Sequence, residues 1–121
     1  MTSITHTLGR LKSRAEFLFV REGAYQAIGA VVIQARPNPT HEQIRVGFTA
    51  TKKIGNAVIR NRAKRRLREV ARMLLPQLGQ TGMDYVFIAR NGTVDRDFNR
   101  LLDDARKALL RLSADKKTTQ R

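Results

Sequence analysis

Seven basic side chains fall within residues 56–72, NAVIRNRAKRRLREVAR, beside a single acidic residue, Glu69. Six of the seven are arginine, whose planar guanidinium group binds phosphate through paired hydrogen bonds and stacks on nucleobases. In an isolated helix, like charges at positions i and i+4 cost about 0.2–0.5 kcal/mol per pair. Because one acid cannot neutralise this stretch, the compensating charge is expected from a partner molecule. The chemistry that these residues suit is the binding of a phosphate backbone.

The charge of the whole chain points the same way. The 121 residues carry 24 Lys and Arg against 10 Asp and Glu, a net charge of +14, and residues 52–72 hold nine of the basic residues and one acid. A concentrated positive field captures polyanions, so nucleic acid is the first candidate partner and an acidic membrane surface the second. The sequence has no apolar run near the ~20 residues of a spanning helix and no signal-peptide core after Met1. We therefore expect a cytoplasmic protein with no membrane partner.

The chain offers few groups for catalysis. It has no cysteine, which excludes disulfides and thiolate metal sites, and its two histidines, His6 and His41, are expected to be solvated. A two-metal nuclease site needs several carboxylates within a few ångströms. We interpret the carboxylates instead as helix caps or surface charges: Glu16, Glu22, Glu42, Glu69, Asp84, Asp95, Asp97, Asp103, Asp104 and Asp115. The sequence thus predicts no catalytic residue and no metal or other cofactor held by the protein alone.

The basic stretch has the periodicity of an amphipathic helix. On a wheel of about 100° per residue, its apolar members form one narrow stripe, and the cations occupy the rest of the surface. That stripe consists of Ile59, Ala63, Leu67, Val70 and Leu74. Asn56 is a good N-cap, and Pro76 with Gly79 is expected to end the helix near residue 75. This arrangement predicts core packing on one side of the helix and a cationic surface on the other.

The remaining elements predict a small α+β domain. Ser13 and Glu16 form a capping box for a helix over 14–22, which Gly23 is expected to end in a left-handed conformation. Strands are predicted over 27–36, 44–51 and 83–90, with two or three strands before the basic helix and the first two as an antiparallel pair. A turn at 91–92 leads to a helix over 95–112. Residues 1–9 and 113–121 are expected to be flexible tails on a single domain, 10–112.

Four segments together resemble a known family. They are RLKSRAEF at 10–17, VGFTATKK at 46–53, KKIGNAVIRNRAKR at 52–65 and DYVFIAR at 84–90. In order and spacing they resemble the protein component of bacterial ribonuclease P, whose central element is the Arg-Asn-Arg helix found here at 60–62. The long basic string is highly specific, and the resemblance covers nearly the whole domain.

The resemblance implies a subunit of a ribonucleoprotein endoribonuclease that removes the 5′ leader from precursor tRNA. Its partners would be the catalytic RNA and precursor tRNA, with no obligate protein partner. The protein would raise substrate affinity at low Mg²⁺, and the Mg²⁺ would be held mainly by the RNA subunit, which performs the chemistry. The implied fold is a single small α/β sandwich with a mixed sheet of about four strands, like the second domain of a small-subunit ribosomal protein. Its strand-helix-strand crossover would be left-handed, whereas strand order alone favours a right-handed one.

Carried over position by position, the resemblance also implies two sets of site residues. The face toward the catalytic RNA would comprise Lys52, Lys53, Asn56, Arg60, Asn61, Arg62, Lys64, Arg65 and Arg68. A cleft for the single-stranded leader, between the first helix and the sheet, would be lined by Lys12, Phe17, Phe48 and Thr49. Phe17 would stack on a base there, because aromatic rings bind unpaired bases without sequence preference.

Other classes of protein fit the residues less well. A structural RNA-binding protein of ribosomal type needs the same basic helix but no leader cleft, and it is the main alternative. A helix-turn-helix DNA reader is disfavoured because strands flank the basic helix. An RNA-recognition sheet needs stacking aromatics on a strand where RVGFTAT falls short. A nuclease that acts alone is opposed by the carboxylate pattern.

Overall fold

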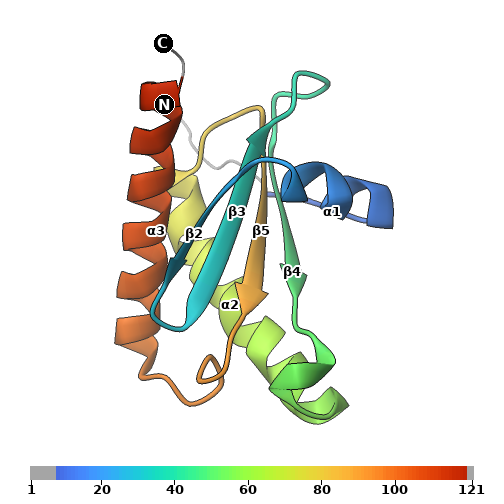
Figure 1. The fold of residues 1–121 in the computed structure, drawn as a ribbon, viewed down its shortest axis with the longest axis vertical. Helices are drawn as coiled ribbons and strands as arrows, with labels where there is room; N and C mark the ends of the chain where they lie inside the picture. Colours follow the sequence, from blue (N-terminus) through green and yellow to red (C-terminus); the bar gives the residue numbers. More distant parts are fainter. Residues whose placement is uncertain (1–7, 120–121) are drawn as a thin grey trace.

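The structure is a computed structural model that describes residues 8–119, with side chains up to Ala114. Five strands form one mixed sheet in the order β1-β4-β5-β3-β2, with α2 and α3 on one face and α1 on the other (Figure 1). The elements in chain order are β1 Gly9–Arg10, α1 Arg14–Arg21, β2 Ala24–Ile28, β3 Val31–Pro37, β4 Ile44–Thr49, the 3₁₀ turn η1 Lys52–Ile54, α2 Ala57–Leu78, β5 Met83–Ala89 and α3 Phe98–Thr119. The predicted α+β class is confirmed, with five strands instead of about four.

The centre of the sheet is β5, and this overturns the predicted pairing of the two preceding strands. β5 is antiparallel to β3 and parallel to β4, so β3 and β4 are not neighbours. Six of the seven residues of β5 are buried, so this strand takes the central position that the less apolar strands cannot fill. In Figure 1 both β4 and β5 point down, α2 lies behind the sheet and β5 lies to the left of β4, which makes the β4-α2-β5 crossover left-handed, as the resemblance implied.

Two strands, β1 and β2, were not located from the sequence. The predicted strand over 27–36 is a hairpin of β2 and β3, which turns at Gly29 with a φ of 54° that glycine adopts without strain. β1 is only two residues long and lies at the boundary of the expected N-terminal tail, where it pairs with β4. Neither a two-residue strand nor a turn inside a β-branched run has a distinctive pattern, so both become visible only when the neighbouring strands are in place.

The helix ends also differ from expectation. Gly23 does not adopt a left-handed conformation; it is needed because a Cβ there would lie 2.3 Å from the carbonyl oxygen of Ala35. α2 runs through Pro76 to Leu78; only two helical residues follow the proline, so little of the helix lies beyond the backbone hydrogen bond that it removes. α3 begins later than predicted and continues past residue 112 to Thr119. Residues 1–7 of the expected N-terminal tail, and 120–121 of the C-terminal tail, lie outside the described residues.

The predicted apolar stripe of α2 forms the core. Ala63, Leu67, Val70 and Leu74 are buried against the sheet and α3, whereas Ile59 at the start of the helix is only half-buried. Burying a side chain of leucine or valine size contributes about 1.5–3 kcal/mol. This contact fixes the rotation of α2 about its axis and turns its basic surface outward.

Candidate nucleic-acid interface

The basic surface of α2 begins in a preorganised loop. The side-chain oxygen of Asn56 accepts a hydrogen bond from the N–H of Ile59 at 3.0 Å, as predicted for the N-cap. Gly55 has a φ of 150°, which other residues rarely adopt, and its carbonyl oxygen accepts a hydrogen bond from Nη1 of Arg60 at 2.8 Å. Arg60 therefore fastens the loop to the helix, in addition to any role that it has toward a ligand.

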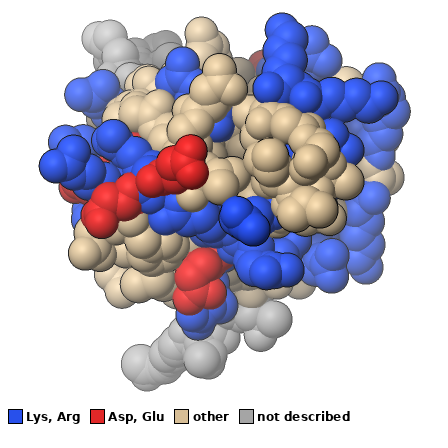
Figure 2. Space-filling model, turned by 90° about the horizontal axis from the view of Figure 1, so that it is seen from below, with Lys and Arg blue, Asp and Glu red and all other residues tan. Residues whose placement is uncertain are grey.

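The other predicted RNA-binding residues lie together on η1 and α2. Lys52, Lys53, Asn56, Asn61, Arg62, Arg65 and Arg68 are exposed, and Lys64 is half-buried. Among the side chains that the structure describes, no ion pair is formed by Arg62, Arg65 or Arg68, whereas Arg72 pairs with Glu69. Figure 2 shows the end of the molecule where α2 begins; Lys and Arg are spread over this face and are densest along its right side, where little acidic surface is visible. Such a surface attracts a polyanion.

Arg66 differs from the rest of the basic residues. Its Nη1 donates to the carbonyl oxygens of Thr93 and Val94 at 2.7 Å, and its Nη2 donates to that of Arg96 at 2.6 Å. The guanidinium carbon lies 5.7 Å from the ring centroid of Phe98. Arg66 therefore stabilises the turn between β5 and α3. It has a structural role, although the sequence pattern around it is typical of a binding surface.

Replacing Arg66 by methionine is expected to destabilise the protein by about 2–3 kcal/mol, because carbonyl groups of the turn lose a charged donor. Urea unfolding monitored by circular dichroism measures the change. The matched control is Arg65→Met, an exposed neighbour whose substitution is expected to stay within about 0.5 kcal/mol. Equal losses in the two variants would contradict the structural assignment of Arg66.

The residues predicted to line one leader cleft are divided between two grooves. Phe48 and Thr49 are neighbours in β4, so their side chains point to opposite faces of the sheet. Phe17 lines both grooves, and Lys12 is exposed and lines neither. The predicted cleft between α1 and the sheet therefore contains Phe17 and Thr49 but not Phe48.

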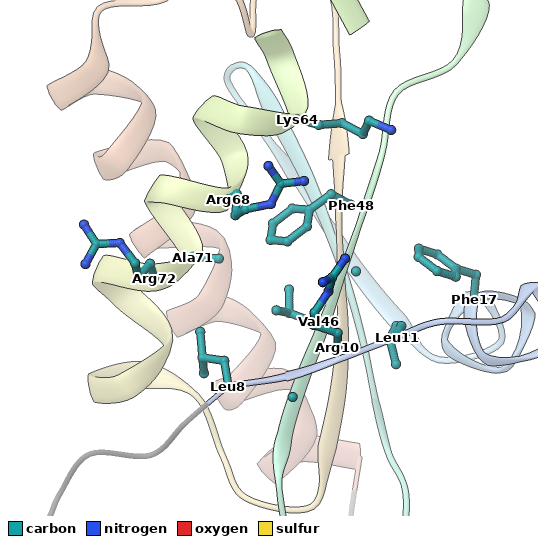
Figure 3. Close-up of a pocket in the computed structure, with 12 residues that line it drawn as sticks. Leu8, Arg10, Leu11, Phe17, Val46, Phe48, Lys64, Arg68, Ala71 and Arg72 are labelled. Atoms are coloured by element: carbon teal, nitrogen blue, oxygen red, sulfur yellow. The ribbon is translucent and has the colours of Figure 1, made fainter. Parts of the chain in front are cut away.

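We name the two grooves by their position. The α1 groove, of about 330 Å³, lies between α1 and the sheet and is lined by Arg14, Phe17, Leu18, Arg21, Gln34, Thr49, Thr51, Val86 and Ile88. The edge groove, of about 480 Å³, lies between α2 and the β1-β4 edge of the sheet (Figure 3). It is lined by Leu8, Gly9, Arg10, Leu11, Phe17, Val46, Gly47, Phe48, Lys64, Arg68, Ala71 and Arg72.

Several lining residues were missed from the sequence. Arg14, Leu18 and Arg21 line the α1 groove together with Phe17, which was predicted. Their spacing of i, i+3, i+4 and i+7 places them on one face of a helix, a signal that was present in the sequence. Arg10 gave no such signal, because it belongs to the two-residue strand β1.

A buried polar network fixes the start of α1 to the sheet. Asp84 of β5 is fully buried and accepts two hydrogen bonds from Arg45 of β4, each of 2.9 Å. Asn38 donates to the same carboxylate at 2.9 Å, and Arg45 also pairs with Glu16 at 3.3 Å. Glu16 in turn accepts from the N–H of Ser13, completing the predicted capping box. The network positions Phe17, the residue that follows Glu16.

These contacts lower the pKa of both carboxyl groups. Burial acts to raise the pKa of Asp84, but the hydrogen bonds from Arg45, Asn38 and His41 outweigh it and leave the pKa below its ordinary value. The backbone N–H groups of Lys12 and Ser13, aided by the charge of Arg45, lower the pKa of Glu16. Both groups are therefore held as carboxylates that anchor cations and N–H donors.

His41 is not the solvated side chain that was expected. It is half-buried, and its Nε2 lies 2.7 Å from Asp84. The N–H of Gln43 donates to Nδ1 at 3.0 Å, so Nδ1 is the acceptor and Nε2 donates to the carboxylate. Its role is to complete the network around Asp84. His6 lies outside the described residues.

The acidic residues with defined partners do not form a metal centre. Asp84 is surrounded by donors, and Asp104 accepts from Arg96 and from the N–H of Ala30. Over the part of the chain that is described, no three His, Asp or Glu side chains come together as metal ligands. These residues do not fit a protein-held Mg²⁺ site. No helix within the described residues is long and apolar enough to cross a membrane.

Comparisons with known proteins identify the family of this chain. The family model described as Ribonuclease P matches residues 6–113. The ribonuclease P protein component of Caulobacter vibrioides is 52% identical over 118 residues, which is 95% of this chain and 79% of the relative. That of Ruegeria pomeroyi is 51% identical over 109 residues, 88% of this chain and 87% of the relative.

Solved structures extend the likeness to the fold. The RNase P protein of Staphylococcus aureus superimposes with a TM-score of 0.70 at 28% identity, covering 83% of this chain and 91% of that chain. The RNase P protein from Thermotoga maritima gives a TM-score of 0.67 at 29% identity, covering 79% and 90%. With a family model over most of its length and relatives at half identity, this chain belongs to the ribonuclease P protein family.

Proposed function

We propose that this protein is the RNA-binding subunit of a ribonuclease P that removes 5′ leaders from precursor tRNA, and that its catalytic RNA subunit performs the hydrolysis. The observation that carries the proposal is the outward basic surface of α2, where Arg62, Arg65 and Arg68 form no ion pair and no carboxylates converge among the described side chains. Arginine-rich surfaces of this kind bind RNA through its phosphates, and the described side chains build no site for metal-assisted hydrolysis. Membership of the family supports the same division of labour.

Within this function, the two faces of the protein receive different parts of the RNA. The predicted RNA-binding residues of η1 and α2 bind the catalytic RNA. The α1 groove binds the single-stranded leader, because it combines an aromatic ring, Phe17, with two cations, Arg14 and Arg21. A cationic groove with an aromatic platform is the usual site for an unpaired strand. By binding substrate and catalytic RNA at once, the protein raises substrate affinity when Mg²⁺ is scarce.

The test is cleavage of precursor tRNA at low Mg²⁺ and near-physiological salt. Three reactions are compared: a bacterial ribonuclease P RNA alone, this protein alone, and the two together. We expect strong cleavage only in the mixture, with a mature 5′ end. Cleavage by the protein alone would place the chemistry on this chain. No stimulation of a competent RNA would favour the main alternative, a structural RNA-binding protein.

Replacing Phe17 by alanine is expected to weaken the binding of precursor tRNA by roughly tenfold, the effect of losing one stacked base. The complex with catalytic RNA is titrated with precursor tRNA and with mature tRNA, which has no leader. Mature tRNA should bind the variant and the wild-type complex equally well. An equal loss for both substrates would contradict the assignment of the α1 groove to the leader.

The matched control for Phe17 is Phe19, which is also half-buried and lies on the same helix. The guanidinium carbon of Arg36 lies 4.1 Å from the ring centroid of Phe19, so Phe19 packs against Arg36. Phe19 does not line the α1 groove. Phe19→Ala is therefore expected to lower thermal stability without separating precursor from mature tRNA.

A further inference from the structure

The edge groove combines an apolar floor with a cationic rim. Val46, Phe48 and Ala71 contribute apolar surface, and Arg10, Lys64, Arg68 and Arg72 contribute positive charge (Figure 3). None of the described residues that line it is acidic, although Glu69 pairs with Arg72 at the rim. Its volume of about 480 Å³ lies within the range of roughly 300–1,000 Å³ that encloses small organic ligands. This chemistry suits a flat, apolar ring that carries a negative charge.

Phe48 is held as a platform in this groove. Its ring packs against Phe87 of the core, with centroids 5.9 Å apart and planes inclined by 56°. It remains half-buried, so part of its surface is open to the groove. The guanidinium carbon of exposed Arg68 lies 5.5 Å from the ring centroid. An aromatic ring packed against the core, beside an exposed arginine, provides stacking for a base and a partner for its phosphate.

The groove continues around the edge of the sheet. β1 pairs with β4 only at Arg45 and Val46, so it stops short of Gly47. A Cβ at Gly47 would lie 2.5 Å from the ring of Phe17 and 3.2 Å from the Cβ of Leu11. The absence of a side chain at this position brings Phe17 close to the strand. The edge groove therefore reaches the ring of Phe17, which also lines the α1 groove assigned to the leader, but most of the edge groove lies on the α2 side of the sheet.

We propose that the edge groove binds one unpaired nucleotide of the catalytic RNA, with its base against Phe48 and its phosphate on Arg68 and Lys64. This inference rests on the proposed function. Three of the four rim cations belong to α2, the helix that we assign to the catalytic RNA, whereas the leader is assigned to the α1 groove. The nucleotide must be unpaired, because bases within an A-form helix are stacked inside it and cannot reach the floor of a groove.

The first test is a titration of wild-type protein and the Phe48→Leu variant with a bacterial ribonuclease P RNA at several salt concentrations. Leucine keeps most of the apolar packing and removes the ring. We expect binding to weaken roughly tenfold, because one base loses its stacking partner. The slope of log affinity on log salt should not change, because no phosphate contact is lost. Arg68→Ala should instead reduce both the affinity and the slope, the latter by about one.

Phe98→Leu is the matched control, because Phe98 is also half-buried against the core but is not one of the residues that line the groove. It should bind the RNA as the wild type does. An equal affinity loss in Phe98→Leu, or none in Phe48→Leu, would overturn the proposal while leaving the proposed function in place. If the wild-type protein does not bind the RNA at all, the proposed function fails and this inference fails with it.

The second test identifies the occupant directly. Phe48 is replaced by the photoreactive amino acid p-benzoylphenylalanine. The full complex of this variant, catalytic RNA and precursor tRNA is then irradiated. Crosslinks to a single-stranded position of the catalytic RNA are the expected result. Crosslinks only to the 5′ leader, or none to either RNA, would overturn the assignment.

Discussion

Replacing Arg62 and Arg65 together by alanine is expected to weaken binding to the catalytic RNA and to lower the slope of log affinity on log salt by about two. Both side chains are exposed, and the structure gives neither an ion pair among the described side chains. Each phosphate contact releases condensed counterions, so each lost contact reduces the slope by about one. The measurement is a set of equilibrium titrations from low to physiological salt.

The control is Arg100→Ala with Arg111→Ala on α3, which removes the same charge from exposed positions on another helix. If the effect comes from local contacts, this pair should leave the slope nearly unchanged. A similar fall in slope for both pairs would indicate that net charge alone governs binding. Arg60→Ala is less informative, because Arg60 also fastens the loop at Gly55 and its loss would disturb the start of α2.

Replacing Asp84 by asparagine is expected to cause the largest loss of stability, about 3 kcal/mol at neutral pH. Removing one partner of a buried ion pair costs about 3–5 kcal/mol, and the lower end applies because Arg45 is 19% exposed and keeps Glu16 as a partner. Urea unfolding measures the difference. Asp103→Asn is the control, because Asp103 is half-exposed on α3 and pairs with Lys107 at the surface, where ion pairs contribute less than about 1 kcal/mol.

Asp84→Asn should also change how the free energy of unfolding depends on pH. The pKa of Asp84 is lowered in the folded protein, so its contribution is fully present above the unfolded pKa of about 4. That contribution is lost as the pH falls through the lower, folded pKa. The wild type should therefore lose more stability than Asp84→Asn as the pH falls below about 4. Parallel losses in the two proteins would contradict the role assigned to the carboxylate.

Local signals in the sequence predicted several features that the structure confirms. The capping box of Ser13 and Glu16, the N-cap at Asn56 and most of the buried stripe of α2 are examples. Each depends on residues within one or two helical turns of each other, so the pattern and its physical cause lie in the same short segment. The basic residues of α2 could be grouped on one helix for the same reason.

Interactions between distant segments could not be predicted in this way. Arg66 looks like its basic neighbours, yet its donors reach the carbonyl groups of the turn after β5. His41 looked solvated, and it lies against Asp84 only because β5 enters the sheet beside β4. In each case the deciding partner is more than twenty-five residues away along the chain.

The sequence by itself determined that this protein has an amphipathic helix with a basic outward surface, because charge and helical periodicity are local properties of the chain. The tertiary structure decided that β5 separates β3 from β4, and that Phe48 and Thr49 face different grooves. The physical reason is that strand order follows from which strand buries the most apolar surface, a comparison that involves the whole chain. Once β4 is placed at the side of β5, the pleat directs its successive side chains to opposite faces of the sheet.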